Sequence, residues 1–228
     1  FAMLSLCINY RVRHGRMPES PFIYLLNCKP LDDSDFKDIP KVIAKELLPE
    51  YIRYIHCGDE SSAQQVLSEL HDNIKGAVSV DDTDKYFFVF GYQRAEELKS
   101  EIKLSQGDDI DSLFNLMKNG SNKPQLSPKE LFHLIVKAGA KQGVHVILWQ
   151  DSYKALEQDD NNIMSYFNLK VAFDMSPEEF SRSVGENDIS LLSENNAIYY
   201  NKARDNQKFR PYQAPDEEWL KGISMKLH

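Results

Sequence analysis

Hydrophobic positions along the chain follow two patterns. Short runs rich in apolar, β-branched and aromatic residues predict strands, and they occupy residues 22–27, 51–60, 86–90, 144–149 and 169–174. The runs at 22–27 and 86–90 have the composition of buried strands. Apolar residues spaced three and four positions apart predict helices, and these stretches include residues 1–12, 61–74, 127–142, 176–184 and 215–223. The chain therefore alternates between the two kinds of element.

This alternation predicts an α/β fold in which a mostly parallel sheet is covered by helices on both faces. Two late segments, "AIYYNKA" at 197–203 and "KFRPYQA" at 208–214, pair as a closing antiparallel hairpin. We expect its turn near residues 204–207 and its strands at one edge of the main sheet.

Several helix and loop boundaries are marked by particular residues. Ser127 and Glu130 form a capping box around Pro128, which predicts a helix start. No capping residue precedes the first helical stretch, so we expect the true N-terminus of the protein to lie upstream of Phe1. Residues 105–128 are rich in Gly, Asn, Ser and Asp, which predicts a surface insertion.

Composition narrows the class of protein. The 228 residues, 42% hydrophobic and 27% charged, suit one substantial soluble domain or two small ones. No apolar run reaches the ~18–20 residues of a membrane span. Three scattered cysteines without a CxxC pair predict reduced thiols and a cytoplasmic protein. The scattered cysteines and histidines lack metal-ligand spacing, so no metal site is predicted.

The order of the segments resembles the motor domain of the FtsK/SpoIIIE family, a branch of the RecA/HerA-like P-loop ATPases. The resemblance covers nearly the whole chain, and "GVHVILWQ" at 143–150 is its most specific part; weaker matches include "FAMLSL", "FIYLLNCKPLDDSDF" and "YFFVFGYQRAEEL". It implies a single FtsK/SpoIIIE-like domain over residues 1–228, with ATP and Mg²⁺ as the family's cofactors and a hexameric ring as its assembly.

The sequence departs from the family at the residues that carry the chemistry. The phosphate-binding pattern GxxxxGK[ST] is absent from these 228 residues. The acid and the adjacent glutamate of the Walker B strand fall on Gly91 and Tyr92, which offer no carboxylate to magnesium or to the attacking water. Glu96 and Glu97 follow one turn later and are expected to point away from the site.

Two further residues align with the end of the family's fourth strand. Gln150 is either a sensor of the γ-phosphate or a polar residue that satisfies loop backbone. Asp151 is either a replacement acid or a residue that starts a turn. Both alternatives remain open from the sequence.

Basic residues cluster at the predicted hairpin: Lys202, Arg204, Lys208 and Arg210, with Phe209 and Tyr212 among them. Such a strand could follow a nucleic-acid backbone, or its charges could protect a solvated sheet edge. The net charge of −8 argues against tight nucleic-acid binding by the chain as a whole.

Two functional hypotheses follow from the resemblance. In the first, the chain is a degenerate ATPase domain that serves assembly or substrate recognition in a larger translocase. Type VII secretion ATPases resemble this arrangement, because they contain several FtsK-like domains in one chain. In the alternative, it is part of an active DNA translocase or secretion motor whose phosphate-binding loop lies upstream of Phe1. The substrate is DNA or a secreted protein. We expect this fragment alone neither to bind Mg·ATP tightly nor to hydrolyse it.

Overall fold

The computed structural model describes most of the chain in nine stretches: residues 2–28, 38–76, 83–101, 126–154, 156, 163–184, 196–201, 204–211 and 215–227. Nearly all of the predicted insertion at 105–128 lies outside them. The chain divides into two compact units, one formed by residues 20–45 and 49–149, the other by residues 1–19, 46–48 and 150–228. We describe each unit by itself.

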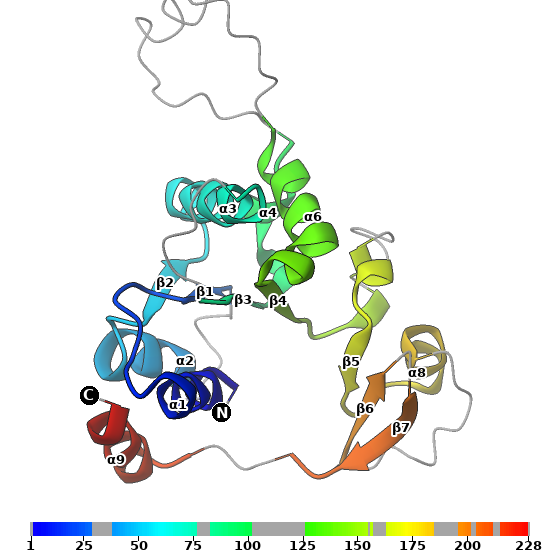
Figure 1. The fold of residues 1–228 in the computed structure, drawn as a ribbon. Coiled ribbons are helices and arrows are strands. Elements are labelled where there is room, and N and C mark those ends of the chain that lie inside the picture. Colours follow the sequence, from blue (N-terminus) through cyan, green and yellow to red (C-terminus); the bar gives the residue numbers. More distant parts are fainter. Residues whose placement is uncertain are drawn as a thin grey trace, which may run out of the picture. The chain divides into compact units, whose positions relative to one another are not determined.

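The first unit is built on a four-stranded parallel sheet in the order β2-β1-β3-β4. Its strands are β1 (Ile23–Asn27), β2 (Ile52–His56), β3 (Lys85–Phe90) and β4 (Val144–Trp149), and β1 pairs in register with both β2 and β3. Every residue of β1 is buried, as expected for a central strand of a parallel sheet. Four of the predicted strands thus lie side by side (Figure 1).

Helices flank this sheet. On one face lie α3 (Glu60–Ile74), α4 (Glu96–Lys99) and α6 (Pro128–Ala138), and on the other lies α2 (Ile39–Val42), continued by the π-helical turn η1 (Ile43–Leu47) (Figure 1). Phe132 of α6 meets Phe87 of β3 edge to face, with ring centroids 6.2 Å apart. The predicted α/β class, a parallel sheet sandwiched by helices, is confirmed.

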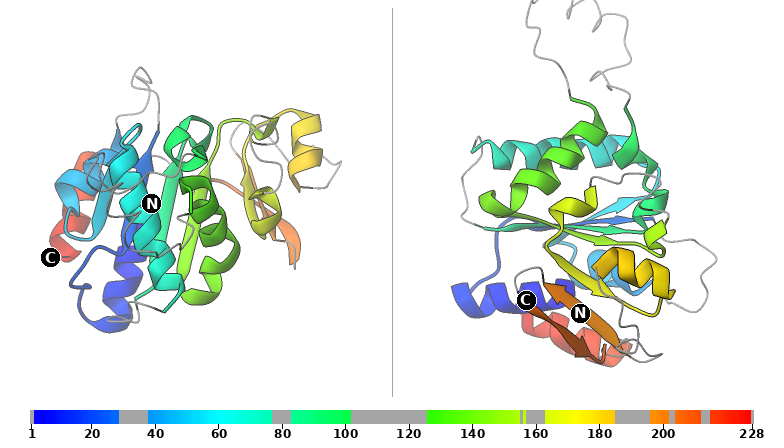
Figure 2. Two further views of the ribbon diagram at one scale, coloured as in Figure 1. Left: turned by 90° about the horizontal axis from the view of Figure 1, so that it is seen from above. Right: turned by 90° about the vertical axis from the view of Figure 1, so that its right-hand side faces the viewer.

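The second unit holds a separate antiparallel sheet in the order β5-β6-β7, where β5 is Leu169–Ala172, β6 is Ala197–Asn201 and β7 is Arg204–Phe209 (Figure 2). Helix α8 (Pro177–Val184) packs Phe180 and Val184 against Ala172 and Ile198. The short 3₁₀ turn η4 (Ile163–Tyr166) precedes β5.

The same unit contains the first and the last helices, α1 (Ala2–His14) and α9 (Glu217–Leu227). They are joined by a hydrogen bond from the Arg11 guanidinium to the Leu227 carbonyl oxygen at 3.1 Å. None of the helices in the described stretches has the length and apolar character needed to cross a membrane.

Two details of the predicted sheet were wrong. The segment 169–174 does not join the parallel sheet, because β5 pairs with β6 in the separate antiparallel sheet. The hairpin β6–β7 likewise adds no strands to the parallel sheet, and Asn201 already pairs with Arg204, so residues 204–207 belong to a strand and not to the turn. A short apolar run predicts a strand without naming its partner, which is decided by tertiary pairing.

The predicted capping box is confirmed at the start of α6. The Ser127 hydroxyl accepts the Glu130 N–H at 3.3 Å, and the Glu130 carboxylate accepts the Ser127 N–H at 2.8 Å. This local signal is recoverable from sequence because both partners lie within four residues of each other.

Candidate functional site

The carboxyl ends of β1, β2, β3 and β4 meet at one edge of the parallel sheet. Ligands of open α/β sheets bind outside this edge. The residues that directly follow the four strands are Cys28, Cys57, Gly91 and Gln150. Gly91 and Gln150, which the resemblance assigns to the Walker B and sensor positions, thus follow β3 and β4 directly, and these assignments stay predictions.

Gly91 ends β3 in a left-handed conformation with φ +73°. Its N–H donates to the Trp149 carbonyl oxygen at 3.1 Å, and its own carbonyl accepts the Arg94 N–H at 2.9 Å. A Cβ added to Gly91 would lie 2.7 Å from the carbonyl oxygen of Cys28, a backbone atom that cannot swing aside. Because of both the dihedral and the contact, this position accommodates glycine and excludes an aspartate.

Tyr92 begins the 3₁₀ turn η2 (Tyr92–Arg94) and is only 2% exposed. Its ring stacks on Phe132 with centroids 5.6 Å apart, and the Lys99 ammonium lies 5.3 Å from the ring centroid. The position aligned with the family's catalytic glutamate is therefore part of the hydrophobic core of this unit.

Gln150 and Asp151 differ in their surroundings. Both polar atoms of the Gln150 side-chain amide are buried and have no hydrogen-bond partner among the described residues, whereas Asp151 is exposed. A buried amide without partners costs about 1–3 kcal/mol, so a group from outside the described residues would stabilise it. The sensor role of Gln150 stays a prediction.

The four basic residues of the hairpin are only partly described. Lys202 and the side chain of Arg204 lie outside the described residues. Lys208 and Arg210 are exposed, the first on β7 opposite Ile198 and the second directly after the strand. Exposed cations on β7 and directly after it are consistent with both interpretations made from the sequence, contact with nucleic acid and protection of a solvated sheet edge.

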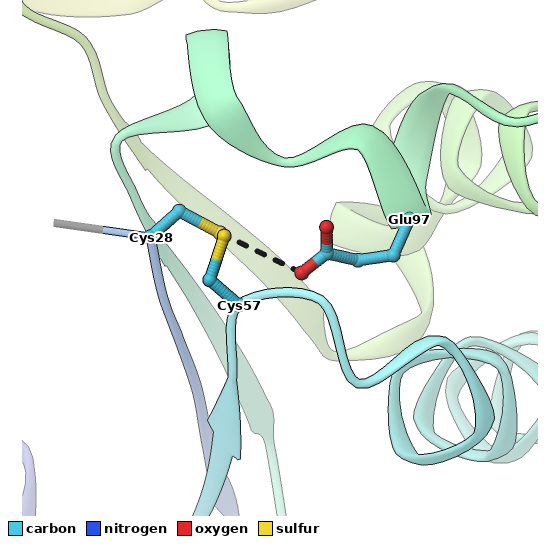
Figure 3. A group of neighbouring side chains, drawn as sticks. All are labelled: Cys28, Cys57 and Glu97. Carbon is cyan, nitrogen blue, oxygen red and sulfur yellow. Dashed lines mark hydrogen bonds between the residues drawn. The ribbon is translucent and has the colours of Figure 1, made fainter. Parts of the chain in front are cut away.

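A second group of side chains lies at the same edge of the sheet and was not predicted from the sequence. Cys28 and Cys57 follow neighbouring strands whose last residues, Asn27 and His56, pair in register. Glu97 of α4 points toward both sulfurs (Figure 3), and the ligand atoms of the three residues all lie within 4.8 Å of one another. The expectation that Glu97 points away from the strand ends was therefore wrong.

Hydrogen bonds define the geometry of this cluster. The Cys28 thiol lies 3.6 Å from Glu97 Oε1, and that oxygen also accepts the Gly58 N–H at 3.1 Å. The Cys57 thiol donates to the Arg94 carbonyl oxygen at 3.5 Å. Cys28 and Glu97 are 1% and 4% exposed, while Cys57 is exposed.

The environment of the Cys28 thiol raises its pKa. Burial is the main factor that raises the pKa of the Cys28 thiol, and the hydrogen bond with Cys57 and the negative charge of Glu97 raise it further. A thiol with a raised pKa is a poor nucleophile. Cys28 is therefore not arranged to act as a nucleophile.

The sequence does hold a signal for the two thiols. The buried runs "FIYLLNC" and "YIRYIHC" each end in a cysteine at the same position. If the two runs are parallel neighbours in register, their cysteines must meet. That adjacency, and the approach of Glu97 from α4, come from the tertiary structure alone.

Comparisons with known proteins can be set beside this geometry. No protein-family model matches the chain, and no curated protein matches it. A solved structure, B204, the DNA-packaging ATPase from Sulfolobus Turreted Icosahedral Virus, is similar with a TM-score of 0.51. The match covers 90% of this chain and 88% of that chain at 8% sequence identity.

The chain therefore has a fold similar to that of this solved structure. At 8% identity the likeness shows the fold alone. It supports the broad ATPase resemblance drawn from the sequence, while the FtsK/SpoIIIE family in particular and the assignment of residues 1–228 to a single domain of that family stay proposals.

Proposed function

We propose that this chain is a degenerate FtsK/SpoIIIE-like ATPase domain that does not hydrolyse ATP and serves assembly or substrate recognition in a larger translocase. One observation carries the proposal: β3 ends in Gly91, at φ +73° and with its Cβ space closed by the Cys28 carbonyl oxygen.

Phosphoryl transfer depends on a positioned metal ion and an oriented nucleophile. Gly91 supplies no side-chain oxygen to a magnesium shell, and the buried ring of Tyr92 supplies no base. The 228 residues also lack the GxxxxGK[ST] loop, whose backbone N–H groups and lysine bind the phosphates. Without these catalytic groups the domain keeps its sheet and helices, which can pack against neighbouring domains in an assembly.

The substrate is a further part of the proposal. Similarity to a DNA-packaging ATPase supports DNA as the translocated molecule, and the type VII resemblance supports a secreted protein. A hexameric ring of the longer protein is consistent with both.

Calorimetric titration of the 228-residue chain with Mg·ATP, together with a phosphate-release assay, tests the proposal. We expect no binding in the micromolar range and no turnover above buffer. Gln150→Ala and Asp151→Ala serve as matched variants at the end of the fourth strand. Micromolar binding, or turnover that either variant abolishes, would overturn the proposal.

The buried amide of Gln150 favours one alternative function. In an active motor with a phosphate-binding loop ahead of Phe1, this amide would face a γ-phosphate. ATP turnover by the full-length protein distinguishes the two functions: turnover that is lost on Gln150→Ala supports the motor, and turnover unchanged by Gln150→Ala assigns hydrolysis to residues outside this site.

A further inference from the structure

We propose that Cys28, Cys57 and Glu97 form a binding site for one thiophilic divalent cation of the Zn²⁺ type. The site lies within the unit of the parallel sheet and joins the ends of β1 and β2 to α4. The inference goes beyond the proposed function, because it involves neither nucleotide nor substrate.

The spacing of the donor atoms suits a single ion. Zinc binds thiolate sulfur at about 2.3 Å and carboxylate oxygen at about 2.0–2.2 Å, usually with tetrahedral geometry, so two of its ligand atoms lie roughly 3.5–3.8 Å apart. Cys28 Sγ and Glu97 Oε1 are 3.6 Å apart, and the Cys57 sulfur lies within 4.8 Å of both. Small side-chain rotations complete the site.

Burial of Glu97 supplies the electrostatic reason for a cation. Its carboxylate is 4% exposed, and its hydrogen bonds within the described part of the chain come from a thiol and a backbone N–H, neither of which carries positive charge. A buried carboxylate is costly unless it is paired or coordinates a metal. The Gly58 N–H also orients the carboxylate, as outer-shell hydrogen bonds do in metal sites.

The binding step balances without any redox change. Each of the two thiols releases its proton to solvent, two sulfur–metal bonds and one oxygen–metal bond form, and the ion stays divalent. The three negative ligands and the ion leave a net charge of −1. Because two protons are released, affinity falls as the pH is lowered. Exposed Cys57 gives the ion a path from solvent, and water fills the fourth position.

The ligand set determines the class of ion. Thiolates select zinc and similar soft ions, while Mg²⁺ and Ca²⁺ require oxygen ligands. A Cys28–Cys57 disulfide is the competing use of the two sulfurs. It would leave the buried carboxylate without a cation, so the three-residue arrangement favours the metal.

The experiment uses the whole 228-residue chain, kept reduced with a phosphine. Zn²⁺ binding is measured by competition with a chromophoric chelator, and Co²⁺ substitution reports sulfur ligation through its thiolate charge-transfer absorption. We expect one ion per chain, unaffected by excess Mg²⁺, and an increase in Tm on addition of Zn²⁺.

Matched variants identify the ligands. Cys57→Ser and Glu97→Gln should each weaken Zn²⁺ binding by more than about 100-fold, since loss of an outer-shell partner alone costs about 10- to 100-fold. Glu96→Gln, the exposed neighbour on α4, and Cys7→Ala, a thiol buried in α1, should bind as the parent chain does. Circular dichroism of each variant separates ligand loss from misfolding, and Cys57→Ser alters only an exposed side chain.

Three results would overturn the proposal. The first is no Zn²⁺ binding by the reduced, folded chain. The second is Zn²⁺ binding that persists in Glu97→Gln, a result that would show that the carboxylate is not a ligand. The third is a Cys28–Cys57 disulfide that forms in air in the presence of equimolar Zn²⁺, which would show that the sulfurs serve oxidation instead.

Discussion

At the scale of single residues, Gly91 shows how backbone geometry can exclude a side chain from the end of a strand. Both the left-handed backbone and the nearby Cys28 carbonyl oxygen require the absence of a side chain. Gly91 therefore contacts its neighbours through its own backbone atoms alone. The requirement for glycine at this position is therefore tied to the packing of the end of β1 against the turn after β3.

Replacement of Gly91 by alanine should destabilise the protein more than the same change at Gly76. The two glycines have nearly equal φ values, +73° and +70°, but a Cβ at Gly76 would meet nothing within 4 Å among the residues that the structure describes. The left-handed conformation alone costs a non-glycine residue about 1–2 kcal/mol, and only Gly91→Ala also displaces backbone. Urea unfolding of the two variants measures the difference, and equal losses would contradict the packing argument.

At the scale of elements, a carboxylate connects α8 to the segment that follows β4. Glu179 accepts hydrogen bonds from the Lys154 N–H at 3.3 Å, the Ser152 hydroxyl at 3.0 Å and the Ser176 hydroxyl at 3.2 Å. These bonds, the Lys154 N–H foremost, hold the pKa of Glu179 below its ordinary value of 4.5. The ionised form is thus the one that stabilises the fold.

Glu179→Ala should lower the free energy of unfolding by about 1 kcal/mol more than Glu178→Ala, which removes an exposed acid from the same helical turn. Because the folded pKa is depressed, the stabilisation is complete above the unfolded pKa and is lost as the pH falls through the folded value. Chemical denaturation at a series of pH values measures both variants. A difference that stays constant down through the folded pKa of Glu179 would show that its charge is irrelevant.

At the scale of the whole molecule, the net charge of −8 causes repulsion between the chain and the negatively charged DNA backbone. The exposed side chains of Lys208 and Arg210 add only a small local positive charge at the hairpin. We therefore expect the 228-residue chain to bind duplex DNA with a Kd weaker than about 10 µM at physiological salt, within the non-specific range.

Fluorescence anisotropy with labelled duplex DNA measures this affinity. Lys208→Ala and Arg210→Ala should change it as little as Lys221→Ala, an exposed lysine on α9. Submicromolar binding that either hairpin variant abolishes would instead assign the hairpin a direct role in nucleic-acid recognition.

The sequence by itself determined the elements whose signals are local. The apolar runs of β1, β3 and β4 predict strands, and Ser127, Pro128 and Glu130 mark the start of α6, because each signal lies within a few consecutive residues. Of these strands β1 is fully buried, whereas β4 is partly exposed. The absence of acids at Gly91 and Tyr92 was also visible in the sequence.

Only the tertiary structure decided which segments meet. It placed β5 in a separate antiparallel sheet, although its apolar run resembles the other strands. It also brought Cys28, Cys57 and Glu97 together from three elements far apart in the chain. Strand order and helix approach depend on the packing of the whole core, so the matching cysteines at the ends of two runs could not by themselves predict that the runs are neighbours or that Glu97 joins them.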